Sequence, residues 1–265
     1  MCRFLSLLLI SFLVIGVASG FRVSQGKILQ NGFLASCFRG YSAAWGQELW
    51  RSDGTSEGTA LIRDINPGSN SGQPYQFRAT DELIYFGADD GSHGFELWRS
   101  DGSATGTQMV ADINDGPAGS FPAGITILDK LVCFGADDGS AGRELWCSAG
   151  TANDTRMILD IYPGSKGSNP RYFTEVDGVL LFEADDGIHG RELWRTDGTP
   201  EGTMLVYDIY AGSDNSWPSN FSKTNGILLF RATDSMHGRE LWRSDGTPEG
   251  TYMVRDLNKG VKSAF

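Results

Sequence analysis

The sequence predicts an all-β protein of five tandem four-stranded units, closed into a five-bladed β-propeller. A tryptophan preceded by Glu-Leu recurs every 48 residues, at Trp50, Trp98, Trp146, Trp194 and Trp242. Each unit contains short apolar runs bounded by Asp- and Gly-rich turns, and no helical periodicity follows residue 20. Repeats of roughly 40 to 50 residues with several strands each are typical of propeller blades, which bury their faces only against neighbouring blades.

The fourth unit illustrates the four strands expected in every unit. Residues 171–174 form the first strand, and the continuous apolar run 178–182 forms a second strand buried on both faces. Residues 191–194 and 204–206 form the third and fourth strands, and Asp and Gly supply the turns between them. We expect the segment 21–34 to close the ring beside the last strand at 252–257. The alternative is an open β-solenoid-like array, which would leave unpaired apolar ends.

The first twenty residues have the layout of a secretory signal peptide, which leaves residues 21–265 as a single repeat domain. Arg3 precedes an apolar run over residues 4–17, and small residues follow at 18–20. No later run is long enough for a membrane-spanning helix, so we expect a secreted protein without a membrane span. Without Arg3, 21 basic residues face 33 acidic ones, a balance that argues against nucleic acid as a partner.

Three cysteines remain after the signal peptide. Cys133 and Cys147 flank one predicted hairpin and could face each other across adjacent strands, so we expect at most one disulfide, between these two. Cys37 occupies the same repeat position as Cys133 two units away, which favours a core role.

A twelve-residue signature accompanies each tryptophan. It reads ELWRSDGTSEGT (48–59), ELWRSDGSATGT (96–107), ELWCSAGTANDT (144–155), ELWRTDGTPEGT (192–203) and ELWRSDGTPEGT (240–251). This pattern resembles the ELWxxDGT-repeat proteins, a group of predicted secreted or surface proteins. The resemblance implies a propeller-like extracellular protein and carries no established chemistry.

Carboxylates recur at fixed repeat positions. The Glu of the Glu-Leu-Trp motif occurs in all five units, which favours a structural role over catalysis. Paired aspartates in the Asp-Asp-Gly turns offer oxygen ligands of the kind that Ca²⁺ prefers, although two carboxylates are fewer than its usual six to eight ligands, and simple turn formation is the favoured interpretation. The candidate calcium ligands are Asp89, Asp90, Asp137, Asp138, Asp185 and Asp186. We expect no other cofactor.

Aromatic residues in the connectors are the candidate ligand-binding residues. Phe121, Trp217 and Phe265 share one repeat position, where they could stack on sugar rings or seal neighbouring blades. Asn153 and Asn220 begin Asn-x-Ser/Thr acceptor sequences for N-glycosylation, relevant if the source is a eukaryote.

These features favour a secreted, non-enzymatic binding or adhesion module that presents repeated loops to an extracellular glycan or protein. A structural surface protein is the second interpretation. A glycosidase-like propeller enzyme is the third, and it is disfavoured because no unit gains the acid and base pair that such an enzyme needs.

Overall fold

The computed structural model describes residues 26–257 and 259, apart from 31–32. The expected signal peptide at 1–20, the start of the expected ring-closing segment and Phe265 therefore lie outside the described residues. Within the described part, the chain forms five four-stranded antiparallel sheets, and consecutive strands pair in each. Among these residues, no helix is long and apolar enough to cross a membrane.

The strands follow the 48-residue period. Sheet 1 consists of β1 (Gly26–Gln30), β2 (Phe33–Ser42), β3 (Gly46–Ser52) and β4 (Ala60–Arg63). Sheet 2 consists of β5 (Tyr75–Ala79), β6 (Ile84–Asp89), β7 (Phe95–Ser100) and β8 (Gln108–Ala111). Sheet 3 consists of β9 (Ala123–Leu128), β10 (Leu131–Asp137), β11 (Arg143–Ser148) and β12 (Arg156–Leu159), with the short 3-10 helix η1 (Ala152–Asp154) before β12. Sheet 4 consists of β13 (Arg171–Val176), β14 (Val179–Asp185), β15 (Arg191–Thr196) and β16 (Met204–Tyr207). Sheet 5 consists of β17 (Ser219–Thr224), β18 (Ile227–Asp234), β19 (Gly238–Ser244) and β20 (Tyr252–Arg255).

The strands predicted for the fourth unit are confirmed. Residues 180–184 of β14 are all buried, as expected for a strand covered on both faces. The structure begins β14 one residue later than the sequence predicted, because Gly178 has a φ of +87° and belongs to the turn before the strand.

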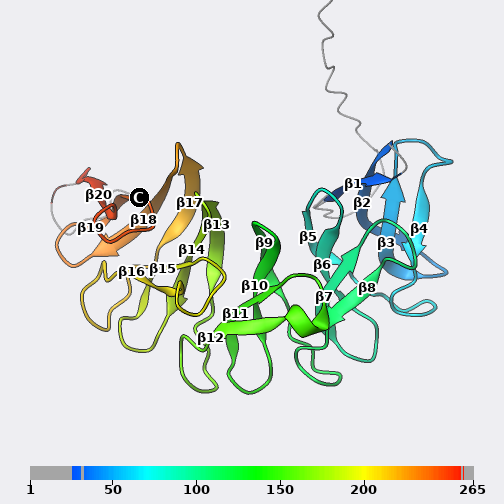
Figure 1. The fold of residues 1–265 in the computed structure, drawn as a ribbon, viewed down its shortest axis with the longest axis horizontal. Helices are drawn as coiled ribbons and strands as arrows, with labels where there is room; N and C mark the ends of the chain where they lie inside the picture. The colour runs from blue at the N-terminus through cyan, green and yellow to red at the C-terminus, as the bar shows by residue number, and fades with distance from the viewer. Residues whose placement is uncertain (1–25, 31–32, 258, 260–265) are drawn as a thin grey trace, which may run out of the picture.

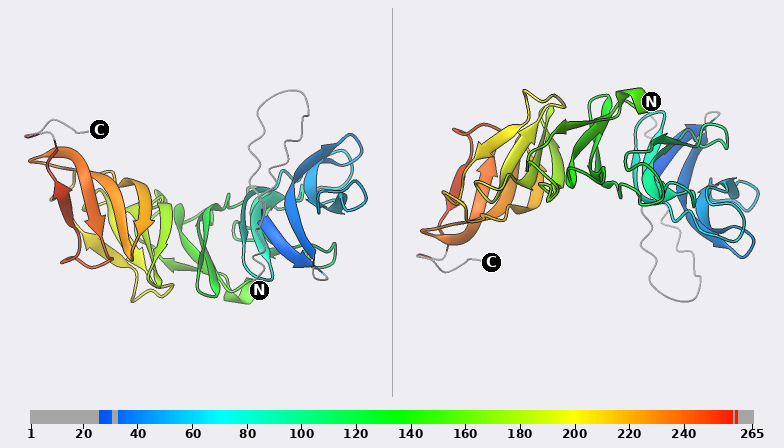
Figure 2. Two further views of the ribbon diagram at one scale, coloured as in Figure 1. Left: turned by 90° about the horizontal axis from the view of Figure 1, so that it is seen from above. Right: turned by 90° about the horizontal axis from the view of Figure 1, so that it is seen from below.

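The five sheets follow one another along an open arc (Figure 1). The first strands of the sheets lie on its concave side, where β5, β9, β13 and β17 are neighbours, and the fourth strands lie on the outer side. Sheet 1 and sheet 5 lie at opposite ends of the molecule in all three views (Figures 1 and 2). The two end sheets therefore do not meet, and the expected closure of the ring by the segment 21–34 beside the last strand does not form among the described residues, because β1 pairs with β2 and β20 with β19.

Successive sheets stack through one repeated apolar joint. Each sheet turns one face, which we call its forward face, toward the next sheet, and its opposite face, the rear face, toward the preceding one. In the joint between sheets 4 and 5, Leu193 and Val206 of the forward face pack with Phe230 and Trp242 of the rear face. Equivalent clusters fill the other three joints. The core is thus divided into four layers between sheets, because an isolated four-stranded sheet cannot bury either face alone.

Candidate functional site

One hollow lies between sheets 2 and 3, and Arg39 of sheet 1 also belongs to its lining. This pocket has a volume of about 360 Å³. Three aromatic residues form its apolar part: the ring of Phe95 lies 5.6 Å from that of Tyr75 and 5.5 Å from that of Phe121, measured between centroids. Arg39 and Arg143 also line it. The pocket therefore offers three adjacent aromatic rings and two guanidinium groups to one ligand.

The backbone fixes Phe121 at the pocket. Its φ is +51°, in the left-handed region that few residues other than glycine adopt. The N–H group of Phe121 donates a hydrogen bond of 2.9 Å to the carbonyl of Phe95, which compensates for this strain. The following Pro122 is buried, while 49% of Phe121 is exposed. The chain thus presents this aromatic side chain to solvent on a rigid support.

Arg143 and Tyr75 are held in place by backbone carbonyls. Arg143 Nη1 donates to the carbonyls of Phe121 and Gly135, each at 2.8 Å. The Tyr75 hydroxyl donates to the carbonyl of Pro122 at 2.9 Å. Burial lowers the pKa of Arg143 and raises the pKa of Tyr75 above its usual value. A partly buried cation on an aromatic wall suits a carboxylate or a carbonyl oxygen attached to an apolar ring.

This pocket breaks the repeat symmetry. At the position of Phe95 the other units carry Gln47, Arg143, Arg191 and Arg239, and at the position of Tyr75 units 3 to 5 carry Ala123, Arg171 and Ser219. Only the second unit combines aromatic residues at both positions. Sequence comparison between units could have revealed this, because the difference in residue type is visible at fixed 48-residue spacing.

The two aromatic candidates that the structure describes, Phe121 and Trp217, do not lie at one site. Phe121 lines the pocket, whereas Trp217 is 45% exposed two units further along, where Arg191 lies 5.5 Å from its ring centroid. Phe265 lies outside the described residues. Whether any of them binds a sugar stays a prediction.

The Asp-Asp-Gly turns direct their carboxylates to their own backbone. Asp89 Oδ1 accepts from the N–H of Gly91, and Asp90 Oδ1 accepts from the N–H groups of Ser92 and His93. The corresponding aspartates at 137, 138, 185 and 186 make the same local contacts. Among the residues that the structure describes, no group of three or more His, Cys, Asp or Glu could hold a metal ion. Calcium at these turns stays a prediction.

The histidines pair with these turns, a relationship that the sequence analysis missed. Nδ1 of His93, His189 and His237 lies 2.8, 2.6 and 2.8 Å from Oδ2 of an aspartate three residues earlier. The hydrogen bond to that aspartate raises the pKa of each histidine. The signal was the constant spacing of three residues in units 2, 4 and 5; Trp45 in unit 1 and Ala141 in unit 3 stand where the other units have the histidine.

The repeated glutamate has the structural role that the sequence favoured. Glu48, Glu96, Glu144, Glu192 and Glu240 are all completely buried. In unit 2, Glu96 accepts from the N–H groups of Asn114 and Ser120 and from the Ser120 hydroxyl. These bonds tie the third strand of one sheet to the connector that enters the next sheet.

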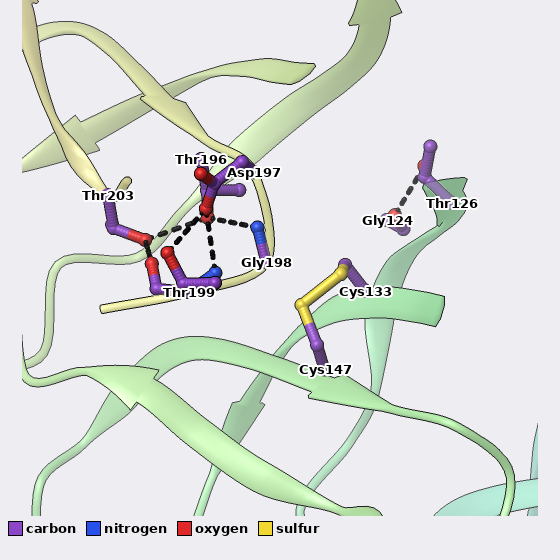
Figure 3. Close-up of a disulfide and its surroundings, with 9 residues drawn as sticks. All are labelled: Gly124, Thr126, Cys133, Cys147, Thr196, Asp197, Gly198, Thr199 and Thr203. Carbon is purple, nitrogen blue, oxygen red and sulfur yellow. Dashed lines mark hydrogen bonds between the residues drawn. A yellow bond between two sulfur atoms is a disulfide. The ribbon is translucent and has the colours of Figure 1, made fainter. Parts of the chain in front are cut away.

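Cys133 and Cys147 form a disulfide between paired positions of β10 and β11, as the hairpin predicted (Figure 3). Cys37 is a buried free cysteine, which agrees with its predicted place in the core. Both candidate glycosylation residues, Asn153 and Asn220, are exposed. Their modification is untested.

No family model matches this chain, and no curated protein matches it. The resemblance to ELWxxDGT-repeat proteins therefore stays a prediction from sequence.

Solved structures of peptidases share the fold. Puromycin hydrolase matches 89% of this chain with a TM-score of 0.54 and 15% identity, and the match covers 39% of that chain. A structure of prolyl endopeptidase matches 87% with a TM-score of 0.54 and 9% identity, covering 34% of that chain. Prolyl oligopeptidase B from Galerina marginata matches 88% with a TM-score of 0.52 and 11% identity, covering 34% of that chain. The chain thus spans well under half the length of these peptidases, and the matched part is their non-catalytic β-propeller domain.

These neighbours correct one expectation. The prediction of a non-enzymatic binding or adhesion module was wrong, because the solved structures that share this fold are those of peptidases, in which the matched part is the β-propeller domain. The sequence could not show this likeness, since the repeated residues indicate how the sheets pack and carry no information about function.

Proposed function

We propose that this chain is a peptidase-associated propeller and that it binds peptide. The observation that carries the proposal is the fold shared with several peptidases at TM-scores of 0.52 to 0.54 over 87 to 91% of this chain. In those structures the matched part is not the catalytic one. Cleavage would accordingly belong to a catalytic unit that the propeller accompanies.

The pocket between sheets 2 and 3 supports a peptide as the ligand. Aromatic walls bind proline and aromatic side chains through apolar contact, as in the grooves that recognise proline-rich segments. Arg39 and Arg143 would pair with a peptide carboxylate or carbonyl beside that side chain. We therefore propose that a segment with a proline or aromatic residue near a free C-terminus occupies the pocket.

Fluorescence anisotropy with a labelled short peptide ending in Pro-Phe tests this function. We expect binding that weakens at least tenfold in Phe121→Ala and in the amidated peptide, and that is unchanged in Trp217→Ala, the variant at the equivalent position of another unit. Absence of binding to the unmodified protein, or equal losses in the two variants, would contradict the proposal. The same samples should leave a fluorogenic Pro-containing substrate uncleaved, and turnover would show that the chain carries its own catalytic residues.

We also propose that the protein is secreted and that its array belongs to the propeller class. The signal-peptide pattern at 1–20 and the disulfide support secretion, because disulfides persist in oxidising compartments. The inner position of the first strands and the fold likeness support the propeller class. N-terminal sequencing of exported protein should find residue 21 first, and a mature protein that still begins at residue 1 would contradict secretion through a cleaved signal peptide.

A further inference from the structure

The joint between successive sheets pairs a forward face with a rear face, and it occurs four times in the molecule. At the ends of the array, sheet 5 has a further forward face and sheet 1 has a further rear face. We propose that the forward face of sheet 5 binds the rear face of sheet 1 in a second copy of this chain, head to tail. This proposal does not depend on peptide binding or on association with a peptidase.

The forward face of sheet 5 has the composition of a covered surface. In sheet 4, Val206 and Ile209 of this face are 3% and 6% exposed beneath sheet 5. Their counterparts one repeat later, Val254 and Leu257, are 46% and 54% exposed. The same kind of apolar side chain therefore occupies the same place on the sheet, but nothing among the described residues covers it. Isolated large apolar residues on a surface are ordinary, whereas an apolar position such as that of Val254, whose four counterparts in sheets 1 to 4 are all buried, indicates an interface.

The rear face of sheet 1 is the complementary half. In every other sheet the phenylalanine of this face is at most 1% exposed, as for Phe86 and Phe230, whereas Phe38 is half-buried. Trp50 is half-buried, like Trp146 in the joint between sheets 2 and 3, whereas Trp98 and Trp242 are 4% and 6% exposed, so Phe38 is the clearer mark of an uncovered face. This face therefore offers the phenylalanine and tryptophan against which forward faces pack in the internal joints.

Within the described residues, a polar contact that occurs at the four internal joints also lacks its partner at the outer end of sheet 5. Oε1 of Glu48, Glu96, Glu144 and Glu192 accepts from the backbone N–H of the residue 24 positions later, in the connector between two sheets. Oε1 of Glu240 is buried and has no partner within the described part of the chain. Its counterpart connector residue, 264, lies outside the described residues. Among the described residues, therefore, nothing completes either the apolar or the polar part of a joint at this end.

The occupant is a second copy because the two halves cannot meet within one molecule as it is arranged. Sheets 1 and 5 lie at opposite ends of the arc in every view (Figures 1 and 2). Four internal joints demonstrate that forward and rear faces of this repeat fit each other. Joining unlike faces is a heterologous contact, which produces a closed ring when the rotation closes and a longer chain when it does not.

Light scattering coupled to size-exclusion chromatography of the exported protein tests the interface. We expect the mass to exceed that of a monomer and to rise with concentration, and the double variant Val254→Asp and Leu257→Asp to be monomeric. Tyr207→Asp, which changes an exposed residue of the fourth strand of sheet 4, is the matched control and should associate like the wild type. A wild-type monomer at all concentrations, or association of the double variant, would overturn the proposal.

A mixing experiment tests the head-to-tail geometry. Phe38→Glu removes the rear half, so this variant should also be monomeric alone, yet an equal mixture with the forward-face variant should give a one-to-one dimer. If Phe38→Glu still dimerises alone while the forward-face variant does not, like faces meet and the proposal fails. If the far-ultraviolet circular dichroism spectrum shows that Phe38→Glu does not fold, the experiment instead mixes wild-type protein with an excess of the forward-face variant. That variant should cap wild-type assemblies and reduce their mass, and an unchanged mass would count against the interface.

Discussion

Glu192 on β15 binds both polar groups of Ser216 in the connector to sheet 5. Oε1 accepts from the Ser216 N–H at 3.0 Å, and Oε2 accepts from the Ser216 hydroxyl at 2.7 Å. The same carboxylate also accepts from the N–H groups of Ile209 and Tyr210. One buried side chain thus joins the third strand, the exit from the fourth strand and the entry to the next sheet.

Removal of this carboxylate should destabilise the array severely. Glu192→Ala leaves several buried donors without an acceptor, so we expect a loss on the order of 3 kcal/mol in the free energy of unfolding. Ser216→Ala should cost only about 1 kcal/mol, because unit 1 has Gly72 at this position and makes the joint without a hydroxyl. Urea denaturation measures both losses. Equal losses for the two variants would show that the backbone contacts of Glu192 contribute little.

The buried glutamates should make stability fall as the pH rises from about 4.5 to about 7. Burial raises the pKa of Glu192 to about 7 from a usual value of 4.5, although its hydrogen bonds oppose the rise, and burial also raises the pKa of Glu96 and Glu144. An acid whose pKa is higher in the folded state stabilises the fold below its unfolded pKa, and this contribution disappears as the pH passes the folded value. The pKa values of His93 and His237 are raised as well, so their stabilising contribution is also lost as the pH rises, over a higher pH range.

Thermal melting between pH 4.5 and 8 measures this dependence. Glu192→Gln should flatten the decline of the melting temperature, since the amide does not titrate, while Glu201→Gln on the exposed turn of the same unit should leave it unchanged. A decline equally steep in Glu192→Gln and in the wild type would assign the dependence to other groups.

The Asp-Gly-Thr turn should contribute a smaller, local stabilisation. Asp197 Oδ1 accepts from the N–H of Thr199 at 2.9 Å and from its hydroxyl at 2.6 Å (Figure 3). Asp197→Ala should therefore cost about 1 kcal/mol in the free energy of unfolding. Unit 3 supplies the reciprocal control: Ala149→Asp combined with Asp154→Gly restores the repeat signature and should stabilise by a similar amount. Urea denaturation measures both, and a neutral Asp197→Ala would show that the turn forms without its side chain.

The single disulfide should contribute about 3 kcal/mol, because it closes a loop of 14 residues in the unfolded chain. We expect Cys133→Ser with Cys147→Ser to lower the melting temperature by roughly 6 to 12 °C for a domain of about this size. Reductant should lower the melting temperature of the wild type and leave that of the double variant unchanged. A wild type insensitive to reductant after unfolding and refolding would contradict this stabilising role.

The strands and hairpins of each unit were predictable from the sequence. The 48-residue period, the apolar run of β14 and the Asp-Gly turns specify strands and hairpins through contacts within about fifty residues, and those predictions are confirmed. The cysteine pair was predictable for the same reason, because both residues flank one hairpin. The curvature of the array depends on the tertiary structure, because the stacking of the sheets at four joints places sheet 1 and sheet 5 at opposite ends of an arc. The tertiary structure also decided which connector residues meet: Phe121 joins Tyr75 and Phe95 in a pocket because two sheets stack, whereas Trp217 has an arginine as its neighbour.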